Sequence, residues 1–473
     1  MTKAFPDHSL SAGPVRLTLA DGELRHLFVN EREIVRRIYF AVRFGPKWDT
    51  APNQVTACEV RAADDHFEVS VRARCRVGPV DYAWTATVTG ATDGAIRFEV
   101  SGAAVSGCHD VRRTGIQVLL GTPDVVGCAY TFTGISGDSA IGFLPARLLP
   151  DNLPAAYREA SYQHPDGLGV ALEFSGTVFG VEDQRNFNES SFKLFSEHAH
   201  TYPELPAGQT ATARVQMSVA RTPSPAKAAP LGVRVSRRRD AAKLPRIYES
   251  DPATPHVLFY RLNHDAATRA AMAPHFRWAY TPAINLYDDV TFMDNVTAIA
   301  DQVLTARAWA PGAVTTCVDP IHFDSIHSRP VRDARNDGAF GAAWTVALVK
   351  WLAVAGVDSA GFRVGPGPAL SLREVLARSA GQPLCPMEIT GQRPWPVDAF
   401  TLESAGGAAT FWFVNLTDAA LTLPVEGLPA GRFEVRRNSG SEYWERAAEF
   451  HLSPDESLRL ELSAYEVCRL SPS

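Results

Sequence analysis

The stretch VFGVEDQRNFNESSFKLF, residues 178–195, places a dense run of polar side chains between two apolar, strand-like ends. It holds five charged residues and five carboxamide or hydroxyl residues, more than an ordinary surface loop requires. The flanking segments 169–174 and 213–219 alternate apolar and polar side chains and are rich in β-branched residues, which predicts β-strands. We therefore expect the polar run at the rim of a β-sheet. It forms either a functional site or a hydrogen-bonded corner that satisfies loop backbone groups.

The chain around this run, from about residue 11 to residue 220, is dense in short alternating segments separated by Gly, Asp and Asn turns. Such spacing is typical of antiparallel sandwiches. The sequence thus predicts a large N-terminal antiparallel β-sandwich over residues 1–222. Its clearest strands are expected at 15–19, 24–29, 68–75, 82–88 and 95–100.

A linker rich in Pro and Ala, residues 221–230, marks a change of pattern, because strands and helices alternate after it. This βα pattern indicates a parallel sheet. Helical periodicity covers 294–310 and 339–355, and Gly356 is placed to end the second helix. The expected strands are 231–235, 256–260, 277–280, 314–318 and 359–362.

The region after the linker is too short for a complete barrel, since only about 160 residues precede the Pro-rich segment 392–396 and an eight-stranded barrel needs at least about 200. We expect an abbreviated (β/α) TIM-like barrel over residues 231–392. Alternation returns over residues 397–473 and predicts a small C-terminal β-sandwich. An incomplete barrel exposes strand edges and apolar faces, so we expect the N-terminal domain or a homodimer to cover them.

Composition narrows the class of protein. The 473 residues are 45% hydrophobic, which is enough for two or three domains, and the net charge of -6 argues against nucleic acid or an anionic membrane as partner. The seven cysteines form no Cys-x-x-Cys pair, as expected of reduced thiols in a cytoplasm. The N-terminus lacks an apolar signal region, so we expect a soluble cytoplasmic protein.

Three motifs carry a resemblance to a known family. Residues 182–193, EDQRNFNESSFK, resemble the EDQRNWTDASFK signature of the D-apionate lactonase family, with Phe187 in place of Trp. The run RIYFAVR at 37–43, followed by WDT at 48–50, and the segments FGAAWT at 340–345 and KWLAVAGVDS at 350–359 resemble further family patterns. The resemblance implies a bacterial sugar-acid lactone hydrolase with a glycoside-hydrolase-like architecture.

Lactone hydrolysis needs a base that activates water and a donor or cation that holds charge on the carbonyl oxygen. The first motif offers both. Glu182 or Asp183 is the candidate base, and only one of them faces a ligand because neighbours on a strand point opposite ways. Arg185, Asn186 and Lys193 are candidates for holding a carboxylate or the developing oxyanion.

The barrel departs from the family at three positions. The resemblance leads us to expect glutamates where this chain has Arg261 and Arg363, and a histidine where it has Asn285. All three positions are candidate substrate-binding sites, and the arginines favour an anionic ligand. Two alternatives to a lactonase follow: a lyase or isomerase on a related sugar-derived substrate, and a non-catalytic sugar-acid-binding protein that lost the barrel acids.

A last group of polar residues follows the expected strand 314–318, at the end where barrel enzymes keep catalytic groups. It consists of Asp319, His322, Asp324 and His327, and we take His322 as the third catalytic candidate. His198 and His200 would face one side of a strand as half of a metal site, but no third ligand is identifiable. We therefore expect no metal and no cofactor.

Overall fold

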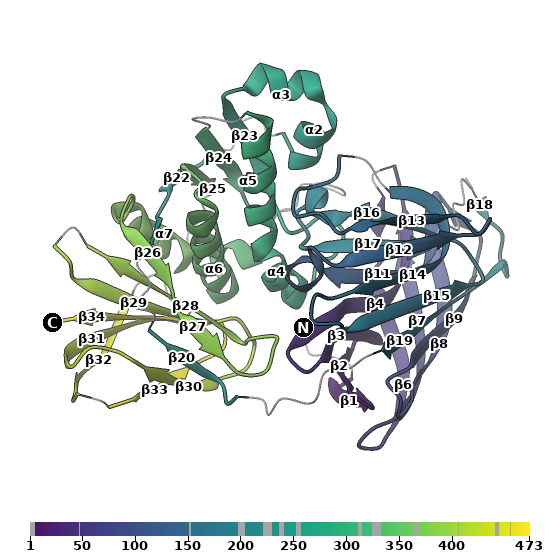
Figure 1. Ribbon diagram of the computed structural model, residues 1–473, viewed down its shortest axis with the longest axis horizontal. Coiled ribbons are helices and arrows are strands. Elements are labelled where there is room, and N and C mark those ends of the chain that lie inside the picture. Colours follow the sequence, from purple (N-terminus) through teal and green to yellow (C-terminus); the bar gives the residue numbers. More distant parts are fainter. Residues whose placement is uncertain are drawn as a thin grey trace. The chain divides into compact units, whose positions relative to one another are not determined.

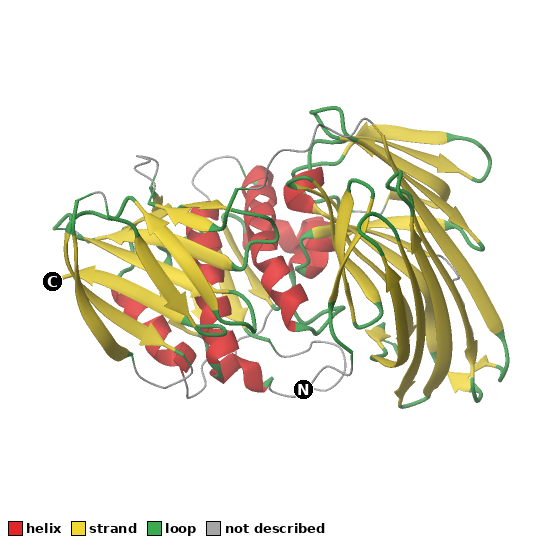
Figure 2. Cartoon of the chain, turned by 90° about the horizontal axis from the view of Figure 1, so that it is seen from below, coloured by secondary structure: helices red, strands yellow, loops and turns green. Residues whose placement is uncertain are grey.

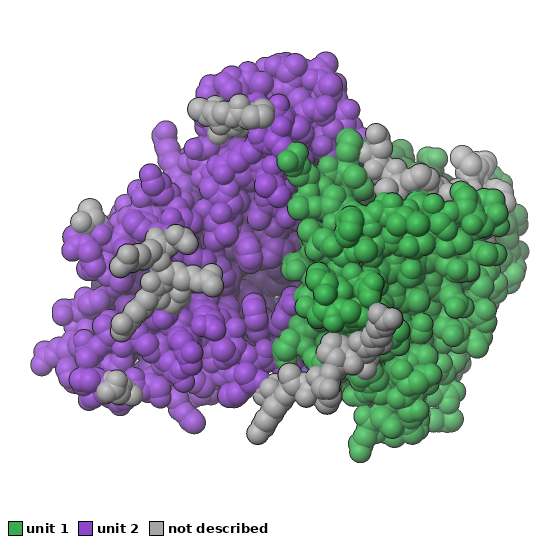
Figure 3. All heavy atoms as spheres, in the orientation of Figure 1, with its two compact units in different colours: residues 1–184, 191–227 green, residues 185–190, 228–473 purple. Residues whose placement is uncertain are grey.

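The computed structural model describes residues 5–46, 48–150, 153–196, 204–220, 229–235, 241–251, 257–310, 315–323, 333–363, 368–404, 406–439, 444–454 and 456–473. The chain separates into two compact units, coloured in Figure 3. Unit 1 holds Met1–Gln184 and Ser191–Lys227, and unit 2 holds Arg185–Ser190 and Ala228–Ser473. The middle of the polar run thus belongs to unit 2 while its two ends belong to unit 1. Among the described residues, no helix is long and apolar enough to cross a membrane.

Unit 1 is built on a 17-stranded antiparallel sheet, whose strands are the yellow arrows on the right of Figure 2. All the strands expected from alternation are present. The strands of the sheet are β1 (His8–Ala12), β2 (Val15–Ala20), β3 (Glu23–Val29), β4 (Arg32–Phe44), β5 (Asp49–Thr50), β6 (Asn53–Ala62), β7 (Phe67–Val77), β8 (Val80–Gly90), β9 (Ile96–Ala104), β11 (Val111–Gly121), β12 (Ala129–Gly134), β13 (Ser139–Phe143), β14 (Leu153–Gln163), β15 (Gly169–Ser175), β16 (Phe179–Asp183), β17 (Ser191–Ser196) and β19 (Thr210–Ala220).

The sheet of unit 1 is continuous, which corrects the expected division into two sheets. Pairing runs from β6 through β7, β8, β9, β19, β15, β14, β16, β17, β11, β4, β3 and β2 to β1 without a break. Alternation identifies strands but carries no signal for where a sheet ends. It therefore does not predict that one continuous sheet curls round to form both layers of the packing. The short strands β10 (Cys108–His109) and β18 (Glu204–Leu205) pair separately, and α1 (Thr122–Val125) follows β11.

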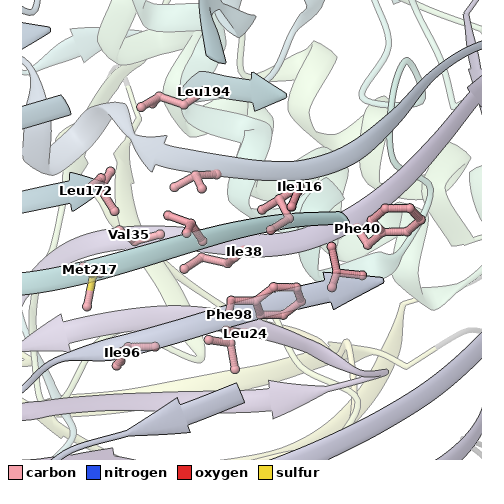
Figure 4. Close-up of a cluster of buried hydrophobic side chains, with 14 of the residues drawn as sticks. Leu24, Val35, Ile38, Phe40, Ile96, Phe98, Ile116, Leu172, Leu194 and Met217 are labelled. Atoms are coloured by element: carbon pink, nitrogen blue, oxygen red, sulfur yellow. The ribbon is translucent and has the colours of Figure 1, made fainter. Parts of the chain in front are cut away.

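The curl brings distant strands face to face across one apolar core. Phe40 on β4 packs against Tyr82 and Trp84 on β8, with ring centroids 5.9 and 5.3 Å apart. Figure 4 shows side chains from β3, β4, β9, β11, β15, β17 and β19 meeting in this core, among them Ile38 and Phe98. The packing is therefore sandwich-like although the hydrogen-bonded sheet is single.

Unit 2 contains a parallel sheet of four strands in the order β22–β25–β24–β23 (Figure 1). The expected strands 277–280, 314–318 and 359–362 correspond to three of them. The strands are β22 (Arg246–Glu249), β23 (His275–Tyr280), β24 (Thr315–Ile321) and β25 (Ser359–Phe362). No closed eight-stranded barrel is formed by the described residues.

The prediction of barrel strands at 231–235 and 256–260 was wrong. Within 256–260, Leu258 makes one isolated bridge to Ala279, and the chain then turns into α2 (Phe259–His264). Phe259 and Leu262 are buried three residues apart, which is helical spacing. Within 231–235, β20 (Gly232–Arg234) pairs with strands of the C-terminal sandwich instead.

The helices of unit 2 include the two expected from periodicity. The helix α6 (Ala339–Ala355) is apolar nearly all round and buried, as expected of a core helix, and Gly356 ends it in the left-handed region with φ of 75°. The expected helix 294–310 is divided into η2 (Asn295–Thr297) and α5 (Ala298–Trp309). The others are α3 (Ala266–Met272), α4 (Asp289–Asp294), η3 (Ala334–Asp337) and α7 (Pro368–Arg378).

The end of the chain forms a two-sheet sandwich around one apolar core, as expected. One sheet has the order β27–β20–β30–β33 and the other β21–β26–β28–β29–β34–β31–β32. Four strands that precede residue 397 join it, namely β20, β21 (Ala242–Lys243), β26 (Pro383–Pro386) and β27 (Glu388–Thr390). The rest are β28 (Val397–Glu403), β29 (Ala409–Asn415), β30 (Leu421–Glu426), β31 (Gly431–Asn438), β32 (Glu445–Leu452), β33 (Leu458–Leu462) and β34 (Val467–Pro472).

Candidate functional site

The two ends of the polar run form a hairpin in unit 1, in which Glu182 on β16 is the direct cross-strand partner of Lys193 on β17. The Glu182 Oε2 and Lys193 Nζ atoms lie 2.7 Å apart. Gln184 also donates from Nε2 to Glu182 Oε2 over 2.5 Å. A carboxylate and an ammonium group are thus fixed side by side, the pair of groups that lactone hydrolysis requires.

The environment of Glu182 is strongly cationic. Burial alone would raise the pKa of Glu182, but the charge and hydrogen bond of Lys193, with the charges of Arg43 and Arg113, outweigh it and lower that pKa. Glu182 is therefore a carboxylate at neutral pH.

Asp183, the other candidate base, points to the opposite side of the strand. Its cross-strand partner is Phe192, a core residue, and its Oδ2 atom accepts a hydrogen bond of 3.0 Å from the backbone N–H of Leu149. Only 3% of Asp183 is exposed. Of the two neighbouring carboxylates, Glu182 is the one that shares a face with Lys193.

Two motifs that are far apart in the sequence meet on this face. The ladder aligns Arg37 on β4 with Leu119 on β11, Leu119 with Lys193 on β17, and Lys193 with Glu182. The next row on the same face aligns Tyr39, Gln117 and Phe195. Ile38 and Phe40, which alternate with these residues on β4, point into the core. The RIYFAVR and EDQRNFNESSFK motifs therefore supply one surface.

Sequence reasoning missed the contribution of β11 to this surface. The guanidinium carbon of Arg113 lies 4.0 Å from the ring centroid of Phe195 and 5.1 Å from that of Trp48. Lys193 Nζ lies 5.5 Å from the Phe195 ring. The alternation in VRRTGIQVLLG, residues 111–121, was the available signal, but the register that brings β11 between β4 and β17 is a tertiary property.

Beside this surface, β3 and β4 hold a buried network of charges. Arg37 donates from Nε to Glu23 Oε2 over 2.7 Å. Glu33 accepts from Arg36 Nη2 and contacts His26 Nδ1, both at 2.9 Å. Burial works to raise the pKa of Glu33, yet Arg36 and His26 hold it at about 2. The network fixes the backbone that carries Arg37.

The middle of the polar run packs within unit 2 through buried hydrogen bonds. The Arg185 guanidinium is fully buried and pairs with Asp301 on α5 at 3.2 Å. Gln302, the next residue on α5, donates from Nε2 to the Arg185 backbone oxygen at 2.8 Å and to Asn188 Oδ1 at 2.7 Å. Asn186 accepts through Oδ1 from Asn263 Nδ2 at 2.9 Å. For these residues the structure gives a hydrogen-bonded corner, one of the two interpretations of the run.

The remaining candidates lie in unit 2, and two of them, His322 and Arg363, directly follow neighbouring strands at the same edge of the parallel sheet. His322 directly follows β24 and is 4% exposed, and its backbone N–H donates to Tyr280. Asn285 is buried in the loop after β23. Arg261 is exposed on α2, and Arg363 follows β25, where its backbone oxygen accepts from Arg373. Asp324, His327, His198 and His200 lie outside the described residues.

Asp319, named with His322, is the centre of a buried cluster on the parallel sheet. It accepts from Tyr248 at 2.9 Å, from Ser250 and from Arg277, and it is 1% exposed. Burial, with Cys317 and Asp319 nearby, raises the pKa of Tyr248. Asp319 thereby links three of the four strands.

The seven cysteines are free thiols. Within the described ranges, no three His, Cys, Asp or Glu side chains gather as a metal site. A groove of about 380 Å³ lies on the outer face of unit 1, between Thr87, Glu99 and Arg214, and does not include Glu182 or Lys193.

Comparison with known proteins gives two family matches. Residues 2–222 match the model described as D-apionate lactonase, N-terminal domain. Residues 394–470 match the model described as D-apionate lactonase, C-terminal immunoglobulin-like domain. A curated D-apionate lactonase from Brucella anthropi is 28% identical over 196 residues, which are 41% of this chain and 32% of that protein. The match thus spans about a third of the relative's length.

Solved structures give weaker likenesses. A GH51 arabinofuranosidase from Xanthomonas axonopodis pv. citri has a TM-score of 0.33 and 10% identity, over 43% of this chain and 54% of that one. A galactose mutarotase related enzyme from Lactobacillus acidophilus has a TM-score of 0.32 and 10% identity, over 47% of this chain and 100% of that one. At such TM-scores neither likeness bears on activity.

Proposed function

Because the chain belongs to the D-apionate lactonase family, we propose that it is a carbohydrate-active hydrolase that opens a sugar-acid lactone. The observation that carries the proposal is the cross-strand pair of Glu182 and Lys193, with its 2.7 Å contact. It lies within the matched N-terminal domain and joins a base and a cation on one face.

In the proposed reaction Glu182 takes a proton from water, and the oxygen of that water adds to the lactone carbonyl carbon. Lys193 stabilises the negative charge that develops on the carbonyl oxygen. Collapse of the tetrahedral intermediate breaks the ring C–O bond, and the released alkoxide takes the proton that Glu182 accepted from water, which restores the Glu182 carboxylate and leaves an open-chain hydroxy acid. The lowered pKa of Glu182 keeps the carboxylate ionised and able to accept the proton. The same lowered pKa makes Glu182 a weaker base.

The test is an assay of a panel of aldonolactones in which a pH-stat measures the rate of acid release. Glu182→Gln should lower kcat by about 10² to 10⁴, the usual cost of losing a base. The matched control is Glu173→Gln, an exposed carboxylate on β15 of the same sheet, which should leave kcat unchanged. Acid release that survives Glu182→Gln at full rate would rule out this base.

A second candidate function, binding of a sugar acid without turnover, is favoured by the engagement of the Glu182 carboxylate by both Lys193 and Gln184. A carboxylate held by two donors is less available to water. Thermal stabilisation by D-gluconate without acid release from any lactone would select this second function.

A further inference from the structure

A row of alternating aromatic and cationic side chains leads from the surface of unit 1 to Glu182. The guanidinium carbon of Arg113 lies 5.1 Å from the ring centroid of Trp48 and 4.0 Å from that of Phe195. Lys193 Nζ in turn lies 5.5 Å from the Phe195 centroid and 2.7 Å from Glu182 Oε2. The row draws on the loop before β5 and on β11, β17 and β16. Contacts of cations with ring faces are favourable, so each member supports the next.

The outer end of the row is held in an unusual conformation. Trp48 is 42% exposed, and its φ of 62° lies in the left-handed region, which a bulky residue seldom adopts. Its backbone N–H donates to the Gly45 oxygen at 3.2 Å, and Arg112 Nε donates to that same oxygen at 3.2 Å. Backbone strain maintained in this way is concentrated at ligand-binding positions. The indole is thus offered to solvent directly over a guanidinium.

The inner end of the row is an electrostatic match for an anion. Lys193, Arg43 and Arg113 all act on the Glu182 carboxylate and outweigh the effect of its burial. A ligand carboxylate placed beside Arg113 is attracted by three cations and repelled by the one charge of Glu182, whereas a neutral ester gains little. Opening a lactone makes this change, because the neutral ring ester becomes an open-chain carboxylate.

We propose that Trp48 and Arg113 form a recognition subsite for the open-chain sugar acid, so that the protein holds the acid more tightly than a neutral polyol or the neutral lactone. Arg113 binds the carboxylate through its N–H groups, and Trp48 packs against the C–H face of the carbon chain. The inference rests on the proposed function for the identity of the ligand. It predicts that the product acid inhibits the reaction competitively.

The test is calorimetric titration of the full chain with D-gluconate and with sorbitol, its uncharged counterpart. Gluconate should bind at least about 10-fold more tightly than sorbitol, and raised salt should reduce the difference. Arg113→Gln should weaken gluconate binding by about 10-fold or more, and Arg113→Lys should recover only part of it. Trp48→Phe should retain binding that Trp48→Ala loses.

The matched control is Arg72→Gln, which removes an exposed arginine from β7 and should change nothing. Equal affinity for gluconate and sorbitol, or gluconate binding unaffected by Arg113→Gln, overturns the subsite. Turnover of lactones without inhibition by gluconate leaves the hydrolase standing and removes the subsite. Gluconate binding that depends on Arg113, with no turnover of any lactone, removes the hydrolase and keeps the subsite.

Discussion

Glu182 Oε2 and Lys193 Nζ lie 2.7 Å apart across the β16–β17 ladder, and the two side chains are 19% and 6% exposed. Because the pair is largely buried, a substitution that removes the proposed catalytic carboxylate also affects the stability of the fold. Removing one partner of a buried pair leaves the other charge without its counter-ion, whereas removing both does not.

We predict that Glu182→Gln lowers the free energy of unfolding by about 3 kcal/mol because it deprives Lys193 of its partner. The double variant Glu182→Gln/Lys193→Met should recover most of that loss and remain inactive. Chemical denaturation of the wild type, both single variants and the double variant gives the coupling energy. Additive effects of the two substitutions would mean that the pair contributes nothing to the fold.

The second prediction concerns acid. The pKa of Glu33 is about 2 in the folded chain, against an ordinary value of 4.5. A lowered folded-state pKa gives stability that is complete above about pH 4.5 and is lost as the pH falls towards 2. The shift corresponds to about 3 kcal/mol.

The measurement is the free energy of unfolding of the wild type and of Glu33→Gln between pH 6 and pH 2. The wild type should lose more of its stability over this range, and the difference between the two proteins should shrink as the pH falls. Parallel curves would show that Glu33 is not the group that titrates. Gly121→Ala is a second probe, because a Cβ there would collide with Glu33 Oε2 and Arg36.

Local pattern predicted the elements better than their partners. Alternation placed β7, β8 and β9, and periodicity with Gly356 placed α6, because burial of one face or of the whole helix is written in neighbouring residues. It misassigned β20, whose partners lie about 160 and 190 residues away in β27 and β30. Pairing at such separations leaves no local trace.

The candidate site divides in the same way. Glu182 and Lys193 were found because one motif contains both. Arg113 was found only through its packing on the Phe195 ring, which depends on a pairing of β11 with β17 that no local pattern reveals. The middle of the motif has as many polar groups as its ends, but these groups make structural contacts. Arg185 pairs with Asp301, and Asn188 forms hydrogen bonds with Gln302 and Thr281.

The third prediction tests this corner. Asn188 has a φ of 60°, donates to the Thr281 oxygen at 2.9 Å and accepts from Gln302 at 2.7 Å. Asn188→Gly and Asn188→Ala each lose both hydrogen bonds, a cost of about 2 kcal/mol. The alanine variant should be about 1 kcal/mol less stable than the glycine variant, since only glycine adopts the left-handed region without strain. A higher melting temperature for Asn188→Ala than for Asn188→Gly would show that the backbone at residue 188 is not strained.

The last prediction separates the parallel sheet from the chemistry. Asp319 accepts from Tyr248, Ser250 and Arg277, so its carboxylate is committed to joining β22, β23 and β24. Asp319→Asn keeps the shape and removes the charge, which should destabilise the fold by about 1–3 kcal/mol. The Arg277 side chain, 44% exposed, is solvated without its partner, which limits the loss.

If the Glu182 surface carries the reaction, Asp319→Asn should leave kcat within about 3-fold of the wild type, since a lost catalytic base costs about 10² or more. His322→Asn is the companion variant at the same end of β24, and the same result is expected. Both are assayed on the lactone panel beside Glu182→Gln, at a temperature at which all the variants remain folded. A drop of 10² or more in Asp319→Asn or His322→Asn, with Glu182→Gln still active, would move the reaction to the parallel sheet and leave the Glu182–Lys193 pair with a structural role.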